Sequence, residues 1–295
     1  MGRTPRQTPM VSPHSHRSGF SFSDALAAQR LLTPRDLRLV GLLAEHRVLT
    51  AHQIARLLFG CDDTAQRRLK LLATRGVLAR FRCCIRPGSQ EYRYTLGPLG
   101  AMIHAADHGL PLPTARTSSE KAFKLSRHPQ LDHLLGINEF FTTLAHHART
   151  HPGSELVVWR NEYAAADMCG RMAHPDGYGH WTENGRSVRF FLEYDTGTEQ
   201  LSRLVDKLHG YRDVATAGLN LPILFVFPGA ARRDNFLRTL TGHPTSTSTL
   251  TIAATPLPDL DAAGPTVPIW QTPASTIRCR LIDLPVPPAA HTSAA

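Results

Sequence analysis

The 295-residue sequence predicts an α/β protein built from two compact domains. Between residues 30 and 110, three stretches with helical spacing precede a change to strand-like alternation. From residue 129 to 283, strands and helices alternate, which is typical of a sandwich around one sheet. Residues 111–128, rich in Pro, Ser, Thr and basic side chains, are expected to be a linker. Residues 1–29 and 284–295 are expected to be disordered tails, the first of them basic and able to form a short helix over 23–32.

Composition excludes several classes of protein. The sequence has no apolar run of 18 residues, so we expect no membrane span, and its polar, basic start lacks the apolar region of a signal peptide. Its 5 cysteines are odd in number and include no CxxC pair, which argues against a disulfide framework or a thiolate zinc site. We therefore expect a cytoplasmic protein.

The positive charge is concentrated in the first part of the chain. Residues 1–127 hold 20 Lys and Arg against 8 Asp and Glu, a net of +12. Residues 128–295 hold 13 against 16, a net of −3, which together give the total of +9. A basic part joined to a mildly acidic one predicts that the first part binds a polyanion.

The first domain begins with three helices. Thr33-Pro34 combines a capping residue with proline at the first helical position, and Thr50 caps the second helix, which ends at Gly60. The third helix starts at Asp62 and Asp63, whose charges suit a helix N-terminus, and continues to residue 75.

A hairpin follows the three helices. The stretch VLARFRCCIRPGSQEYRYTL predicts two short strands around a Pro-Gly-Ser turn, and a helix over 98–108 closes the domain. Three helices followed by a two-stranded hairpin, in that order, make a winged helix-turn-helix, whose third helix enters the DNA major groove.

Nine polar side chains of this domain are the candidates for contacts with double-stranded DNA. The third helix buries Ala65, Leu69 and Leu72, and its other residues can read bases or grip phosphates. The candidates on this helix are Gln66, Arg67, Arg68, Lys70 and Thr74, and those on the hairpin are Arg80, Arg82, Arg86 and Arg93, with Arg86 at the wing tip. Two alternatives stay open: an ordinary solvated basic face, and a protein–protein module.

The second domain is predicted to open with a helix over 130–149. Strand 155–163, a hairpin over 175–195, helix 199–215, strand 221–227 and helix 232–240 follow. Weaker strands are expected near 248–254 and 275–282. Asn138 lies among apolar neighbours on the first helix, so it needs a buried hydrogen-bond partner.

The hairpin gathers carboxylates. Asn184-Gly185 predicts a two-residue type I′ turn, which fixes the register so that Glu183 faces Arg186 and Trp181 faces Val188. Counting back, Tyr178 faces Phe191 and Asp176 faces Glu193, while Asp195 shares the face of Glu193. Opposed like charges destabilise a strand pair, so a divalent cation, a Lys or Arg, or protonation should offset them. Mg²⁺ is the ion that such oxygen-rich clusters suit.

Pro175-Asp176, a hairpin and Glu193-x-Asp195 resemble the PD-(D/E)xK nucleases, whose fold is that of restriction endonucleases. The resemblance implies that Asp176 and Glu193 hold the metal ion. Asp195 stands where this family has its lysine, and Lys207 on the next helix could supply a migrated amine. Alternatively, Lys207 belongs to a charge ladder with Glu199 and Arg203. The family's glutamate on the first helix would be Glu139, whose alternative is an ordinary exposed residue.

The chain as a whole resembles the replication-relaxation family of actinobacterial plasmids and mobile elements. The resemblance spans about residues 30–240 and rests on LTPRDLRLVGLLAEHRVLTAHQIARLLF, TAQRRLKLLATRGVL, LDHLLGINEFF and FFLEYDTGTEQLSRLVDKLHGYRD. It implies a DNA-binding accessory factor for plasmid replication, relaxation or transfer. The expected partners are duplex DNA, plasmid replication or relaxase proteins, and a second copy of the chain. An active Mg²⁺-dependent nuclease or nickase and a winged-helix repressor are the alternatives.

Overall fold

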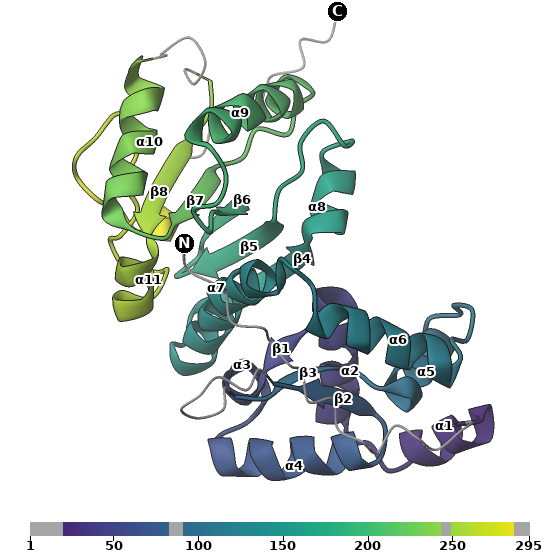
Figure 1. Cartoon of the computed structure of the whole chain (residues 1–295). Helices are drawn as coiled ribbons and strands as arrows, with labels where there is room; N and C mark the ends of the chain where they lie inside the picture. Colours follow the sequence, from purple (N-terminus) through teal and green to yellow (C-terminus); the bar gives the residue numbers. More distant parts are fainter. Residues whose placement is uncertain (1–19, 83–90, 243–248, 286–295) are drawn as a thin grey trace, which may run out of the picture. The chain divides into compact units, whose positions relative to one another are not determined.

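A computed structural model describes residues 20–82, 91–242 and 249–285 of the chain (Figure 1). Contacts divide the chain into two compact units, Met1–Asn138 and Glu139–Ala295. Each unit contains helices and one sheet, which confirms the predicted α/β class.

The N-terminal unit is mainly helical, and several of its helices begin at a capping side chain. Thr33 and Thr50 each form a capping box with the residue three positions later, Asp36 and Gln53. Its elements are α1 (Phe22–Gln29), α2 (Pro34–His46), β1 (Leu49–Thr50), α3 (Ala51–Leu58), α4 (Asp62–Thr74), β2 (Leu78–Phe81), β3 (Arg93–Leu96), α5 (Pro98–Asp107) and α6 (Ala115–Ser126).

A three-stranded sheet in the order β1-β3-β2 completes this unit. Strands β2 and β3 are antiparallel, with Arg80 opposite Tyr94 and Phe81 opposite Arg93. The sequence predicted these two strands but not β1, which is two residues long. The predicted wing tip, Arg86 with its Pro-Gly turn, lies outside the described residues.

The segments predicted as linker and tails are partly ordered structure. Residues 115–126 form helix α6, which buries Ala122 and Leu125, so the expectation of a linker over 111–128 was wrong for this stretch. Its Thr-Ser-Ser sequence is more typical of a linker, but Thr114 caps a helix here. Helix α1 occupies the end of the predicted tail 1–29, and Leu284 of the predicted C-terminal tail is buried.

Helix α7 (Leu131–Thr150) begins within the N-terminal unit, so the observed division lies ten residues beyond the predicted start of the second domain at 129. Leu131 packs with Val48, Phe81 and Leu125 in a small core. The Asn138 amide donates hydrogen bonds to the carbonyl oxygens of His46 and Val48, at 3.2 and 2.6 Å. This confirms that Asn138 needs a buried partner.

The C-terminal unit is built on a five-stranded sheet in the order β4-β5-β6-β7-β8. The first three strands are antiparallel, and β6, β7 and β8 are parallel. Its further elements are β4 (Ser154–Asn161), α8 (Glu162–Met168), β5 (Gly177–Glu183), β6 (Arg186–Tyr194), α9 (Leu201–Thr216), β7 (Ile223–Phe227), α10 (Ala230–Gly242), β8 (Ile252–Pro256), α11 (Leu257–Ala263) and a 3₁₀ turn at Leu281–Asp283.

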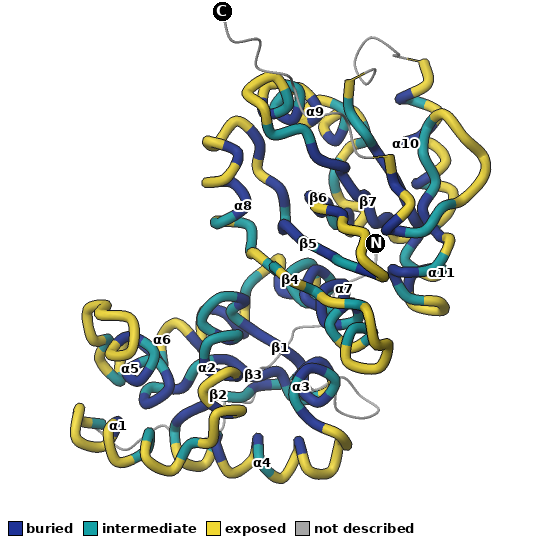
Figure 2. The backbone as a smooth tube through the Cα atoms, turned by 180° about the vertical axis from the view of Figure 1, so that it is seen from behind, coloured by how far each residue is buried: buried dark blue, intermediate teal, exposed yellow. Residues whose placement is uncertain are grey.

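Both faces of the sheet are covered at its central strands, and β5 and β7 are mostly dark in Figure 2. On one face, Phe225 and Tyr178 pack in a core with Leu208 of α9 and Phe236 of α10. On the other, Phe140 of α7 lies edge-on to Phe190 and Trp270. The parallel strands are apolar on both sides for this reason.

The hairpin of β5 and β6 has the predicted register. Glu183 pairs with Arg186 and Trp181 with Val188, and the turn residues Asn184 and Gly185 both have positive φ. The ladder ends at Gly177–Leu192, where the Asp176 amide donates to the Leu192 carbonyl oxygen at 2.9 Å. The predicted pairing of Asp176 with Glu193 therefore lies one step beyond the regular ladder.

Two details of this unit differ from the predictions, and a third feature was not predicted. Residues 162–168 form α8 and not the end of a strand, because Asn161 accepts a hydrogen bond from the Ala164 amide and starts a helix. The expected strand near 275–282 is reduced to one bridge, Trp270–Cys279. Strand β4 shifts register by a bulge between Leu156 and Val158.

Candidate nucleic-acid interface and carboxylate site

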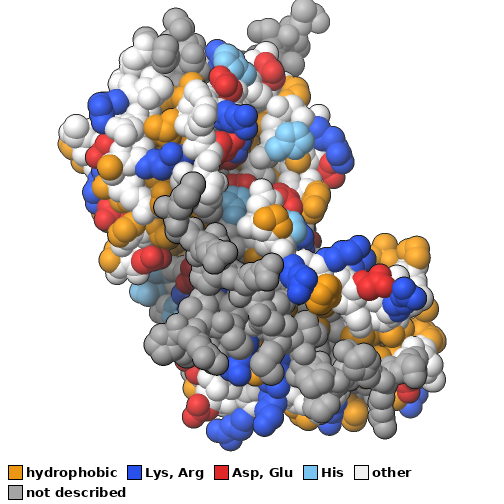
Figure 3. All heavy atoms as spheres, viewed as in Figure 1, with side chains coloured by type: hydrophobic (Ala, Val, Ile, Leu, Met, Phe, Trp, Pro, Cys, Tyr) orange, Lys and Arg blue, Asp and Glu red, His pale blue; other side chains and the backbone are white. Residues whose placement is uncertain are grey.

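Helix α4 presents a polar face to solvent. Ala65, Leu69 and Leu72 are buried, as predicted. The exposed residues of the helix include Gln66, Arg67, Lys70 and Thr74. In Figure 3, blue Lys and Arg side chains gather at the lower edge of this unit, where Figure 1 shows α4. The helix therefore turns long polar side chains outward along its length.

A hollow of about 750 Å³ is lined by residues of α3, α4 and the β2–β3 hairpin. Four of its lining residues are cationic, and two acidic residues, Asp62 and Glu91, also line it. One Glu91 oxygen accepts a hydrogen bond from the His52 amide at 3.1 Å, at the start of α3. The cationic residues are Arg67, Lys70, Arg80 and Arg82.

The hairpin arginines of this hollow lie over one aromatic ring. The guanidinium carbons of Arg80 and Arg82 are 4.4 and 4.8 Å from the centroid of the Tyr92 ring. These distances are those of cation–π contacts.

Two of the predicted DNA contacts are instead engaged inside the N-terminal unit. Arg68 donates from Nε to Asp36 at 3.0 Å and also contacts the Leu31 carbonyl oxygen. Arg93 is only 8% exposed and lies 3.3 Å from a carboxylate oxygen of Asp132. Alternation along β3 turns Arg93 to the face opposite Tyr92 and Tyr94. We therefore leave Arg68 and Arg93 out of the proposed interface.

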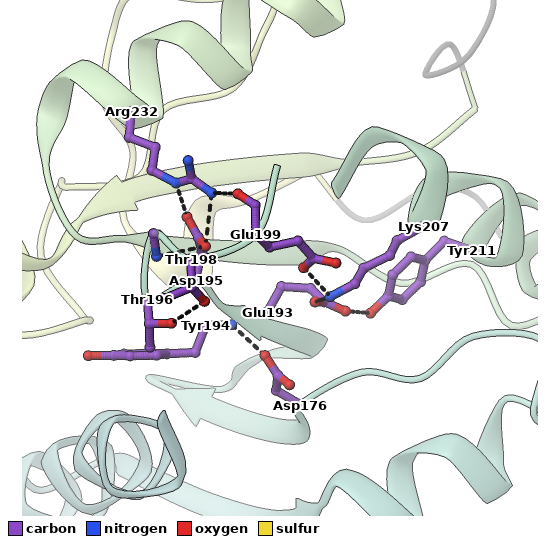
Figure 4. Close-up of polar contacts among 11 residues, drawn as sticks. Asp176, Glu193, Tyr194, Asp195, Thr196, Thr198, Glu199, Lys207, Tyr211 and Arg232 are labelled. Atoms are coloured by element: carbon purple, nitrogen blue, oxygen red, sulfur yellow. Dashed lines mark hydrogen bonds and ion pairs between the residues drawn. The ribbon is translucent and has the colours of Figure 1, made fainter. Parts of the chain in front are cut away.

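In the C-terminal unit, Asp176 and Glu193 come together at the end of the hairpin (Figure 4). One oxygen of Asp176 accepts a hydrogen bond from the Tyr194 amide at 2.7 Å. The Glu193 side chain is 3% exposed and points toward α9. The Asp176 carboxylate is close enough for its charge to act on Glu193.

Helix α9 supplies a cation and a hydrogen-bond donor to Glu193. The Lys207 ammonium is 3.2 Å from Glu193 Oε2 and 3.2 Å from Glu199 Oε2. The Tyr211 hydroxyl donates to Glu193 Oε1 at 2.6 Å. The structure thus combines the two interpretations of Lys207, because the amine reaches the hairpin carboxylate and also pairs with Glu199.

Burial and neighbouring charges shift the pKa values of Glu193 and Lys207. Burial, and then the charge of Asp176, raise the pKa of Glu193 to about 7, although Lys207 and Tyr211 act against the rise. Burial acts to lower the pKa of Lys207, but the charges of Glu193 and Asp176 outweigh it and raise that pKa. The ammonium is therefore charged at neutral pH.

Asp195 pairs with a different cation, Arg232. It accepts a hydrogen bond from Arg232 Nη2 at 3.1 Å and one from the Gly197 amide at 2.9 Å. Arg232 comes from α10 and also contacts the Glu199 carbonyl oxygen (Figure 4). The predicted acidic trio is therefore divided into a pair beside Lys207 and a separate aspartate beside an arginine.

Glu139 lies near Tyr194 and Asp261. Burial, and then the charges of Asp261 and Glu139, raise the pKa of Tyr194 to about 12. The Tyr194 side chain leaves β6 on the face opposite Glu193, because strand side chains alternate.

Two residues of the carboxylate site were not among the candidates. Tyr211 appeared in the sequence only as part of the apolar stripe of its helix, yet it follows Lys207 by four residues and so shares its face. Nothing near Arg232 in the sequence pointed to its role, since its partner, Asp195, is 37 residues away.

The donor set suits a small, hard cation. Asp176 and Glu193 offer carboxylate oxygens, and Mg²⁺ commonly binds one or two carboxylates and keeps several waters. Burial is the main cause of the raised pKa of Glu193, and a cation would offset the second cause, the charge of Asp176. In the part of the chain that the structure describes, no group of three or more His, Cys, Asp or Glu side chains is placed to hold a metal ion.

Within residues 20–82, 91–242 and 249–285, no helix has the length and apolar character needed to cross a membrane. No curated protein and no solved structure matches the chain. The replication-relaxation family matches residues 40–228, which is more than half of the sequence. The match begins within α2 and ends just after β7, so it covers α4, the hairpin and the carboxylate pair. On this match, the chain belongs to the replication-relaxation family.

Proposed function

We propose that the N-terminal unit is a winged helix-turn-helix that binds duplex DNA, and that the chain is an accessory factor of plasmid replication or relaxation. The hollow between α4 and the β2–β3 hairpin, with its four cationic residues, is the observation that carries the proposal. The net charge of +12 over residues 1–127 supports it, because phosphates attract such a surface.

Helix α4 and the β2–β3 hairpin would have different roles in DNA binding. Gln66, Arg67 and Lys70 lie on the exposed face of α4, where glutamine can read adenine and arginine or lysine can read guanine in the major groove. Arg80 and Arg82 of the hairpin also line the hollow and would contact the phosphate backbone, which fixes orientation without reading sequence.

Fluorescence anisotropy with a labelled duplex tests this proposal. Arg67→Ala with Lys70→Ala should weaken binding about tenfold or more and reduce the slope of log K against log salt by about 2. Arg116→Ala with Lys121→Ala removes the same charge from α6 without touching the hollow, so it is the matched control. Equal affinity of wild type and the α4 variant would refute the interface.

The plasmid role has its own test. Footprinting on the complete parent plasmid should protect a site beside a replication or transfer origin. Protection confined to a promoter would instead indicate the repressor function.

A second candidate function is Mg²⁺-dependent cleavage of DNA by a C-terminal unit of PD-(D/E)xK type. The Lys207 ammonium, 3.2 Å from Glu193 Oε2, favours it, because it supplies the amine that Asp195 cannot. Asp176 and Glu193 would hold Mg²⁺, which when bound supplies charge stabilisation at the scissile phosphate. Lys207 would orient the attacking water beside the carboxylate pair.

Incubation of supercoiled plasmid with the protein and Mg²⁺ tests this candidate. Nicking should appear in wild type and fall at least a hundredfold in Asp176→Ala and Lys207→Met, in line with the loss of one group of a catalytic unit. Arg203→Met removes an exposed cation from the same helix and should leave nicking unchanged. Absence of nicking in wild type, with duplex binding retained, would leave the accessory role alone.

A further inference from the structure

The hairpin side of the hollow carries a block of two arginines and two tyrosines. Arg80 faces Tyr94 in the ladder, and the same register continued by one pair sets Arg82 opposite Tyr92. Residues two apart on a strand share a face, so all four side chains lie on the face that lines the hollow. Phe81 and Arg93 turn to the opposite face and are buried.

Tyr92 is the centre of this block. Both guanidinium carbons lie within 5 Å of its ring centroid, at 4.4 Å for Arg80 and 4.8 Å for Arg82. Tyr94 is 3% exposed, and its ring centroid is 6.3 Å from that of Tyr92. Burial raises the pKa of Tyr94, and a hydrogen bond from Arg80 opposes the rise.

We infer that Tyr92 is a positioning residue for DNA binding, which holds Arg80 and Arg82 in the orientation that meets the phosphate backbone. The inference rests on the proposed duplex-binding function. Tyr92 itself makes no contact with DNA in this scheme and acts through the two arginines.

The physical reason is preorganisation. An arginine side chain has many rotamers, and ordering it on binding costs entropy that weakens the complex. A ring beneath the guanidinium restrains those rotamers in the free protein. Stacking uses the face of the guanidinium and leaves its N–H donors at the edge, where they can bind phosphate oxygens.

The chemistry predicts which substitutions preserve the effect. The attraction arises from the negative face of the ring and does not need the hydroxyl. Tyr92→Phe therefore keeps it, Tyr92→Leu removes it with modest loss of bulk, and pentafluorophenylalanine in place of Tyr92 reverses the ring polarity while keeping the shape.

Anisotropy titrations of the full-length variants against one labelled duplex, at several salt concentrations, test the inference. Tyr92→Phe should bind within about twofold of wild type, while Tyr92→Leu and the pentafluoro variant should bind about three- to tenfold more weakly. The slope of log K against log salt should stay at the wild-type value in all three, because no cation is removed. Arg80→Ala with Arg82→Ala should reduce that slope by about 2.

The outcomes separate the two proposals. If wild type binds with a steep salt dependence and the pentafluoro variant binds as tightly as Tyr92→Phe, the positioning role is refuted and duplex binding stands. If wild type shows no salt-dependent binding, the proposed function itself fails. The pentafluoro variant keeps the test decisive if Tyr92→Leu is unstable, because it preserves the volume of the ring.

Discussion

At the scale of single residues, the ion pair of Asp36 and Arg68 links α2 to α4. Asp36 is 1% exposed, accepts from Arg68, and also closes the capping box of α2 with Thr33. One carboxylate therefore starts one helix and holds the flank of another. This explains why a cation on the predicted DNA-reading helix turns inward.

The pH dependence of this pair is a first prediction. Burial acts to raise the pKa of Asp36, but hydrogen bonds from Arg68 and Thr33 hold it below its ordinary value. Such a group stabilises the fold above the unfolded pKa of about 4 and loses that contribution as pH falls through the lower folded pKa. Asp36→Asn should cost about 1–3 kcal/mol at pH 7, and its difference from wild type should shrink toward pH 3.

Urea denaturation at both pH values measures this difference. Asp206→Asn, an exposed carboxylate of α9, is the control and should show no such convergence. A difference that is constant between pH 7 and pH 3 would contradict the ionised pair.

Individual residues were predictable where a local rule applied. Asn138 among apolar neighbours required a partner, and it has two backbone carbonyls. The partners of Glu193 and Asp195 were not predictable, because Lys207 and Arg232 approach from α9 and α10 through the tertiary fold. The sequence indicated that the carboxylates need a cation or protonation to offset their charge, and the structure shows Lys207 beside Glu193 and Arg232 beside Asp195.

At the scale of elements, the N-terminus of α3 ties a helix to the hairpin. Thr50 belongs to β1, which pairs with β3, and it also caps α3 through its contacts with Gln53 at 2.9 and 3.2 Å. Leu49 and Thr50 thus connect α3, which also lines the hollow, to β3 of the hairpin.

Loss of this cap is a second prediction. Thr50→Ala should lower the free energy of unfolding by about 1 kcal/mol, because the Gln53 amide loses its acceptor in a buried place. Thr50→Ser should retain most of the stability, since its hydroxyl can form the same bond. Chemical denaturation of the three proteins provides the comparison, and equal losses in both variants would show that packing of the methyl group dominates.

Elements were predictable where length and turn chemistry agreed. The two-residue turn at Asn184-Gly185 fixed the register of β5 and β6 in advance. Strand β1 and helices α8 and α11 are two to seven residues long, too short for periodicity to reveal. Helix α6 was hidden by a composition that is more common in linkers.

At the scale of the whole molecule, charge is divided between the two parts of the chain. The third prediction is that salt dependence of duplex binding depends on cations of residues 1–127 alone, where the net charge is +12. Arg203→Gln with Arg212→Gln on α9 should leave the slope of log K against log salt unchanged. The same loss of charge at Arg67 and Lys70 should reduce it by about 2, as measured by anisotropy between 50 and 200 mM salt. A reduced slope in the α9 variant would place phosphates against the second unit as well.

The bulge in β4 has a consequence for behaviour in concentrated solution. Strand β4 ends one side of its sheet, where backbone amides and carbonyls would otherwise offer a straight template to a strand from another molecule. The register shift between Leu156 and Val158 breaks that template midway. We therefore expect the bulge to hinder the pairing of β4 with a strand of another molecule, which is the first step toward fibrous aggregation.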